Sequence, residues 1–123
     1  MPHPTKPITS TPADRELVHL VKKAACQHFE ITEEQLVTEH SRTVANIRFL
    51  CYWIIARNTQ LKDYAIGDFF NRRRACVIYG IEHVDVYRKI YRQTIDNLRS
   101  LAEIANTFDK KHAWRIQSIN TTN

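Results

Sequence analysis

The sequence is poor in the residues that break helices. Its 123 residues include only two glycines and four prolines, and three of the prolines fall within the first seven positions. This scarcity excludes collagen-like and linker-rich chains, and it argues against an all-β fold, which needs frequent turns. The longest mainly apolar stretch, Phe49 to Ala56, is far shorter than the ~20 residues of a membrane span. With 43% hydrophobic residues, the chain can still build a core, and its length predicts one domain.

Cysteines and candidate catalytic groups are also few. The three cysteines Cys26, Cys51 and Cys76 cannot all pair, and no charged-then-apolar leader opens the chain. These features predict a cytoplasmic protein whose cysteines are reduced and buried. Cys26 and His28 could form half of a metal site, but no second pair stands at zinc-ligand spacing, so we expect no metal and no other cofactor. The carboxylates and histidines are scattered, which predicts no catalytic residues, no enzyme and no small-molecule substrate.

The positive charge is concentrated in one segment. Between Ser41 and Arg74, seven cations stand against only Asp63 and Asp68, so this segment carries the whole net charge of +5. The cations are Arg42, Arg48, Arg57, Lys62, Arg72, Arg73 and Arg74. Arginine predominates, and its planar guanidinium suits phosphate groups and base edges. A segregated basic stripe favours nucleic acid as the partner, although many charge runs are only solvated surface.

Composition divides the chain into three parts. Residues 1–10 are rich in proline, serine and threonine and are predicted to form a disordered N-terminal arm. Residues 11–106 carry apolar residues at helical spacing and are predicted to form an all-α domain, a compact bundle of about six helices. Residues 107–123 are polar and are predicted to form a flexible tail.

N-cap residues mark three helix starts, at Thr11, Thr32 and Ser41. The first predicted helix runs to about residue 28, where His28 lies on its apolar face and is interpreted as a packed core residue. The second spans one or two turns and ends near residue 38. The third has an apolar face over Val44–Ile55; a strand is the competing interpretation there, but the run exceeds ordinary strand length.

Two short helices joined by a tight basic turn follow. Leu61–Phe70 is predicted to be helical and to end at Asn71, a residue that tolerates the left-handed conformation of many helix ends. The next helix starts near Arg73 and buries Val77, Ile78, Ile81 and Val84. A long last helix is predicted over Val86–Ala105, with an apolar stripe that includes Tyr87, Ile90, Tyr91, Ile95, Leu98 and Leu101.

Two short helices joined by a tight turn are typical of a helix-turn-helix, in which the second helix enters the major groove of DNA. A helix N-terminus presents free amides to phosphate, arginine can chelate guanine, and asparagine can chelate adenine. The pattern predicts binding of double-stranded DNA. Base reading is assigned to Asn71, Arg72, Arg73, Arg74, Ala75 and Cys76. Two ordinary core helices joined by a charged turn are the simpler alternative.

Several short motifs of this segment resemble those of a known protein family. Its motifs, in chain order, are Ser41-Arg42, Arg48, Leu61, Ile66-Gly67-x-x-Phe70 and Val77-Ile78-Tyr79-Gly80. This order resembles the C-terminal DNA-binding domain of DnaA, the bacterial chromosomal replication initiator. The resemblance covers about Leu17 to Ala105 and runs without a gap from Ser41 to Phe70. It implies a Trp-repressor-like helical domain that binds duplex DNA.

The resemblance also implies individual roles. The family reads bases with an Asp-His-Thr-Thr stretch, and the corresponding positions here are Arg73, Arg74, Ala75 and Cys76, so we expect a different target sequence. Arg72 matches the arginine of the family's turn. Arg48 matches an arginine that contacts phosphate, and His40 takes the place of a minor-groove arginine, beside Arg42. The residues assigned to phosphate or minor-groove contacts are His40, Arg42, Arg48 and Lys62.

The expected role is therefore that of an accessory replication or transcription-regulatory factor, associated with the nucleoid when bound to DNA. No Gly-x-x-x-x-Gly-Lys-Ser/Thr loop is present, so ATPase activity is not expected. The competing interpretation is a protein-interaction module that has lost base reading. In that case the stripe of Val86–Ala105 would bind a partner helix or a second copy, although the same stripe can simply close the domain's own core.

Overall fold

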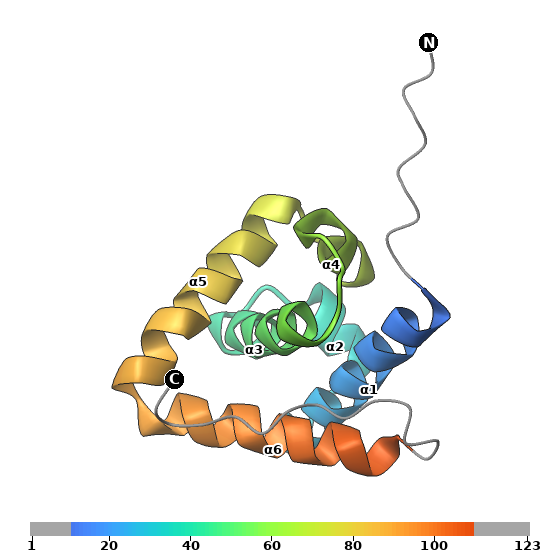
Figure 1. The fold of residues 1–123 in the computed structure, drawn as a ribbon. Coiled ribbons are helices and arrows are strands. Elements are labelled where there is room, and N and C mark those ends of the chain that lie inside the picture. The colour runs from blue at the N-terminus through green and yellow to red at the C-terminus, as the bar shows by residue number, and fades with distance from the viewer. Residues whose placement is uncertain (1–10, 110–123) are drawn as a thin grey trace.

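The computed structural model describes residues 11–109, and within this range it contains six α-helices and no strand (Figure 1). The helices are α1 (Pro12–Phe29), α2 (Glu33–Thr38), α3 (Arg42–Asn58), α4 (Asp63–Phe69), α5 (Arg74–Ile90) and α6 (Arg92–Phe108). The predicted all-α bundle is confirmed, and the alternative of a strand over Val44–Ile55 is wrong. None of the described helices is long and apolar enough to cross a bilayer.

The two predicted end segments are mostly outside the described residues. This applies to the whole arm 1–10 and to residues 110–123 of the tail. The tail was predicted to begin at residue 107, but α6 continues to Phe108 and Asp109 is buried. The ordered domain therefore extends slightly beyond the predicted boundary at residue 106.

The three predicted N-caps are present. Thr11 Oγ1, Thr32 Oγ1 and Ser41 Oγ each accept a hydrogen bond from the backbone N–H three residues later, over 3.0, 3.0 and 3.2 Å. Each bond satisfies a donor that has no partner inside its helix, which stabilises a helix start by about 1 kcal/mol. These caps fix where α1, α2 and α3 begin and so where Arg42, the first residue of α3, lies.

Helix α3 is the centre of the bundle, and it packs against each of the other five helices (Figure 1). The predicted buried face is confirmed, because Val44, Ile47, Cys51, Ile54 and Ile55 are all buried. Further buried residues of α3 are Arg48, Leu50, Tyr52 and Trp53. A helix enclosed on most of its circumference explains why its apolar run is nearly continuous.

A buried lysine connects α1 to α4. Lys22 Nζ donates a hydrogen bond to the carbonyl oxygen of Phe69 over 2.5 Å and lies 4.9 Å from the centroid of the Phe70 ring. Burial lowers the pKa of Lys22, and the carboxylate of Glu33, 4.0 Å away, opposes that shift. The last carbonyl oxygens of a helix have no backbone donor within that helix. The Lys22 ammonium supplies such a donor to the carbonyl oxygen of Phe69, the last residue of α4.

The boundary between the last two helices differs from the prediction. Helix α5 continues through Val86 to Ile90, and the chain turns at Tyr91. As a result Tyr87, Ile90 and Tyr91, predicted as part of the apolar stripe of the last helix, are exposed, and so is Val86. The rest of the predicted stripe is buried, namely Ile95, Leu98, Leu101, Ala102 and Ala105 of α6, which packs against α1. The stripe of α6 thus closes the core of this domain.

Candidate nucleic-acid interface

Helices α4 and α5 pack against each other and are joined by the turn from Phe70 to Arg73. Asn71 adopts the left-handed conformation there, with φ 55°, as predicted. The backbone N–H of Arg72 donates to the carbonyl oxygen of Gly67 over 2.9 Å. Arg73 is the N-cap residue of α5, and no side chain caps that helix. The amides at the start of α5 are therefore not occupied by a capping side chain.

Five of the six residues predicted to read bases are exposed. They are Asn71, Arg73, Arg74, Ala75 and Cys76. Arg72 differs, because it is half-buried and its Nη1 donates to the carbonyl oxygens of Phe70 (3.3 Å) and Asn71 (3.1 Å). Its Nη2 is buried without a hydrogen-bond partner. Arg72 was predicted to read bases together with its neighbours, whereas its side chain folds back onto its own turn.

A hollow of about 470 Å³ opens beside this turn. Its lining residues are Tyr64, Asp68, Asn71, Arg72, Arg73 and Arg74. Tyr64 and Asp68 of α4 were not expected from the sequence, although their spacing of four residues places them on one helical face. Three guanidinium groups and one carboxylate give the lining a positive balance, which suits an anionic ligand.

A groove of about 390 Å³ lies between α3 and α5 and shares the lining residue Arg72 with this hollow. It is lined by His40, Ala45, Arg48, Phe49, Tyr52, Arg72, Ala75, Cys76 and Tyr79. The structure thus brings His40 and Arg48, predicted to contact the DNA backbone, close to Ala75 and Cys76. The aromatic walls of the groove were not part of the predicted site.

Arg48 lines this groove, but it is almost fully buried and its guanidinium bonds within the fold. Only 4% of the residue is exposed, and its Nη1 donates to the carbonyl oxygens of Leu36 (3.0 Å) and Glu39 (2.7 Å). Burial, followed by the charge of Arg72, lowers the pKa of Arg48. The predicted phosphate contact is therefore corrected to a structural role, because the carbonyl end of α2 needs a donor and Arg48 supplies it.

Tyr52 lies beside this guanidinium and favours its charged form. Burial raises the pKa of Tyr52 to about 12, even though Arg48 and Arg72 act in the opposite direction. The phenol therefore stays neutral at physiological pH. Arg48 holds the end of α2 on α3 through its bonds to Leu36 and Glu39, and the buried Tyr52 lies beside it.

The other three predicted backbone contacts, His40, Arg42 and Lys62, are exposed. Arg42 is the first residue of α3, and its charge acts on His83, whose pKa is lowered mainly by burial and further by Arg42. Lys62 is the N-cap residue of α4 and lines neither the hollow nor the groove. Of the predicted backbone contacts, only His40 and Arg48 line the groove beside the α4–α5 turn, so the four residues do not form one cluster.

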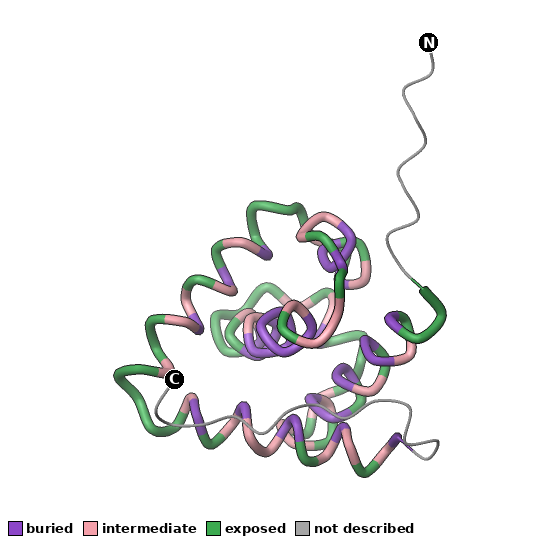
Figure 2. Tube along the Cα trace, viewed as in Figure 1, coloured by how far each residue is buried: buried purple, intermediate pink, exposed green. Residues whose placement is uncertain are grey.

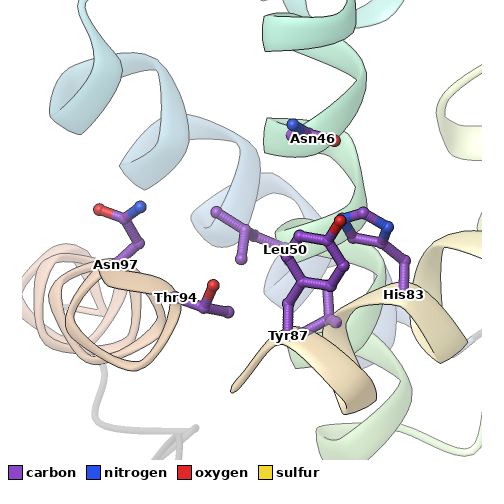
Figure 3. Close-up of a pocket in the computed structure, with 7 residues that line it drawn as sticks. Asn46, Leu50, His83, Tyr87, Thr94 and Asn97 are labelled. Carbon is purple, nitrogen blue, oxygen red and sulfur yellow. The ribbon is translucent and has the colours of Figure 1, made fainter. Parts of the chain in front are cut away.

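A smaller pocket of about 140 Å³ lies between α3, α5 and α6 (Figure 3). Figure 3 shows His83 and Tyr87 of α5 beside Leu50 of α3, with Thr94 and Asn97 on α6. The His83 and Tyr87 rings stack with centroids 3.9 Å apart. Ligand pockets for organic molecules usually measure about 300–1,000 Å³, so this space suits water and we assign it no ligand.

The cysteines only partly follow the prediction. Cys51 is buried, and burial raises its pKa to about 12. Cys26 is half-buried and Cys76 is exposed, so the prediction of three buried cysteines is wrong for Cys76. His28 is half-buried rather than fully in the core, with Nε2 3.3 Å from Asn97 Oδ1. In residues 11–109 no three histidine, cysteine or acidic side chains gather as a metal site would require.

Comparisons with known proteins do not supply a family. A scan against protein-family models finds no match, and a search of curated proteins finds no significantly similar sequence. The resemblance to the DnaA domain rests on the motifs between Ser41 and Gly80 alone.

Proposed function

We propose that this protein binds double-stranded DNA through the N-terminal end of α5. One observation carries the proposal: Arg73 and Arg74 are adjacent, exposed and located where α5 begins without a capping side chain. The hollow beside them has one lining carboxylate, that of Asp68, against three guanidinium groups. The segment with the whole excess charge of the sequence thus presents part of that charge at a helix start.

The chemistry of this helix end suits a nucleic acid. The positive end of the helix dipole and free backbone amides favour a phosphate at the start of α5. An exposed arginine can donate two parallel hydrogen bonds to guanine in the major groove, which is wide enough to admit a helix. Ala75 and Cys76 are small, so they allow the backbone of α5 to approach the base edges closely.

The roles within the interface follow from exposure. We assign base contacts to Arg73 and Arg74, with Asn71 beside them on the same turn. Arg72 shapes the turn through its bonds to the carbonyl oxygens of Phe70 and Asn71. Arg42, Lys62 and His40 are exposed and can meet backbone phosphates. The proposed cellular role is that of an accessory replication or transcription-regulatory factor, supported by the resemblance to the DnaA domain.

The experiment is a fluorescence-anisotropy titration of a mixed-sequence duplex at several salt concentrations. The wild type is compared with the double variant Arg73→Ala/Arg74→Ala. The matched control is Lys23→Ala/Arg92→Ala, which removes the same charge from exposed positions on α1 and at the start of α6. Counterion release predicts wild-type affinity that falls steeply with salt. The arginine-turn variant should bind about tenfold or more weakly, whereas the control should lose about threefold or less.

Two results would contradict the proposal. One is a folded wild type that does not bind the duplex at low salt. The other is an equal loss in the arginine-turn variant and in the control, which would reduce the effect to net charge. The alternative of a pure interaction module through α6 loses support, since the apolar stripe of that helix is buried.

A further inference from the structure

Exposed apolar side chains gather on α5. In the part of the chain that the structure describes, the large hydrophobic residues that are exposed are Tyr79 (61%), Val86 (52%), Tyr87 (40%), Ile90 (63%) and Tyr91 (51%). All of them lie on α5 or directly after it. Figure 2 shows exposed residues along the outer edge of α5, which no other described helix covers. A stripe of this kind is typical of a surface that binds another molecule.

The stripe has the spacing of a coiled-coil seam. Cys76, Tyr79, His83, Val86 and Ile90 follow one another at intervals of three, four, three and four residues. These are the a and d positions of the heptad repeat, whose side chains pack between two helices. The seam extends over about two heptads, so it can support a helix pair of modest affinity.

The charges that flank the seam indicate the orientation of the partner helix. Glu82 and Lys89 each precede an a residue, so both occupy g positions, and both are exposed. In an antiparallel pair of two copies, Tyr79 packs beside Ile90 of the second copy and His83 beside Val86. Glu82 then lies on the same side as Lys89 of the second copy, offset by roughly 3 Å of helical rise. Symmetry produces this attractive pair twice.

A parallel pair would not have this complementarity. It would place His83 against His83 of the second copy, and it would set Glu82 opposite Tyr87. The antiparallel arrangement instead surrounds His83 with an apolar neighbour and gives each flanking charge an opposite charge. A single helix face that is self-complementary in this way points to a second copy of the same chain as its occupant.

We propose that this protein forms an antiparallel homodimer through α5, with Tyr79, Val86 and Ile90 as the apolar residues of the seam, His83 between them and two Glu82–Lys89 ion pairs at its side. This surface replaces the predicted partner surface over Val86–Ala105, most of whose apolar stripe is buried. The proposal does not depend on DNA binding. The register leaves Arg73 and Arg74 outside the seam.

The test is sedimentation equilibrium of the full chain at concentrations up to about 0.5 mM. The variants are Glu82→Lys, Lys89→Glu and the double Glu82→Lys/Lys89→Glu. Each single change turns two attractive pairs into two repulsive ones, which should weaken the dimer about tenfold. The double variant restores opposite charges and should return to within about threefold of the wild type. Glu103→Lys, an exposed site on α6, is the matched control and should leave the affinity unchanged.

A second pair of variants tests the apolar seam. Val86→Glu and Ile90→Glu should each weaken the dimer about a hundredfold or more, because a carboxylate would be buried in the interface. Both side chains are more than half exposed, so helicity by circular dichroism should be retained. A wild type that is monomeric at the highest concentration overturns the proposal and assigns the face to a different partner. The proposal is also overturned if Val86→Glu leaves the dimer affinity unchanged, or if the double charge variant dimerises as weakly as the single variants.

Discussion

The backbone N–H of Arg72 bonds to the carbonyl oxygen of Gly67 over 2.9 Å, and this bond folds the arginine turn back onto α4. A Cβ atom at position 67 would overlap the carbonyl oxygen of Arg72 and would come within 3.4 Å of Val77 Cγ2. Glycine is required at this position because the backbone of the turn occupies the space in which a side chain would start. The position of the arginines thus depends on a residue that carries no charge.

Replacing Gly67 should therefore destabilise the domain. We expect Gly67→Ala to lower the free energy of unfolding by about 1–3 kcal/mol, the usual cost of overpacking, measured by urea denaturation. At Gly80 the added carbon would come 2.5 Å from the Phe49 ring and 2.9 Å from the buried Tyr52 ring, so Gly80→Ala should destabilise the domain as well. The control is Glu103→Ala, at an exposed site on α6, which should change stability by about 0.5 kcal/mol or less. Equal stability of Gly67→Ala and wild type would contradict the close approach.

Arg48 should be needed for stability more than for DNA binding. Arg48→Met keeps most of the side-chain volume but leaves the carbonyl oxygens of Leu36 and Glu39 without their donor. We expect a loss of about 1–3 kcal/mol in thermal or urea unfolding. Arg42→Met, at the exposed start of the same helix, should change stability by only about 0.5 kcal/mol or less. An Arg48→Met protein of normal stability but reduced DNA affinity would restore the phosphate contact predicted from the sequence.

Arg73 and Arg74 should differ from the exposed Lys62, which lies at the opposite end of α4. If either chelates guanine, its replacement by alanine should cost about 1–3 kcal/mol and relax base preference at one position. Lysine should fail to restore the preference, because it lacks the planar fork. Lys62→Ala should instead weaken all duplexes alike. Competition binding on duplexes selected from a random pool separates these two patterns. Identical behaviour of all three alanine variants would contradict the distinction between base contacts and phosphate contacts.

The stability of the protein should depend on the protonation of His83. Burial and the charge of Arg42 lower the pKa of this imidazole in the folded state, so the unfolded chain takes up its proton at a higher pH. The resulting stability is therefore present above the unfolded pKa of about 6.5 and is lost as the pH falls below it. Urea denaturation should show that the free energy of unfolding of the wild type, relative to that of His83→Gln, decreases between pH 8 and pH 5. A constant difference between the two proteins would exclude His83 as the source.

The helix starts could be predicted because their signals are local. Thr11, Thr32 and Ser41 each need only a backbone amide three residues away, and Asn71 needs only its own tolerance for a positive φ. The end of α5 lacked such a signal. Tyr91 caps α6 without a side-chain bond, and the apolar spacing through Tyr87 and Ile90 is the same for a core face and for an exposed seam.

The candidate site was predictable in part for the same reason. The clustering of Arg73 and Arg74 at a helix start follows from the local sequence, and both are exposed as expected. The burial of Arg48 could not be inferred in this way, since its partners are the carbonyl oxygens of Leu36 and Glu39 at the end of a different helix. The role of Tyr79 in the groove could not be inferred either, because the opposite wall belongs to α3, and the sequence does not show how α3 packs against α5.

The length of α5 sets a scale that can be compared with DNA. In the antiparallel dimer proposed above, the two Arg74 residues are separated by about 21 residues of helical rise, roughly 32 Å. Successive major grooves on one face of B-form DNA recur every ~34–36 Å. The two arginine turns would then match an inverted repeat whose half-sites are centred one helical turn apart. Inserting about half a turn between those half-sites would rotate the second one to the opposite face of the duplex, out of reach of the second turn.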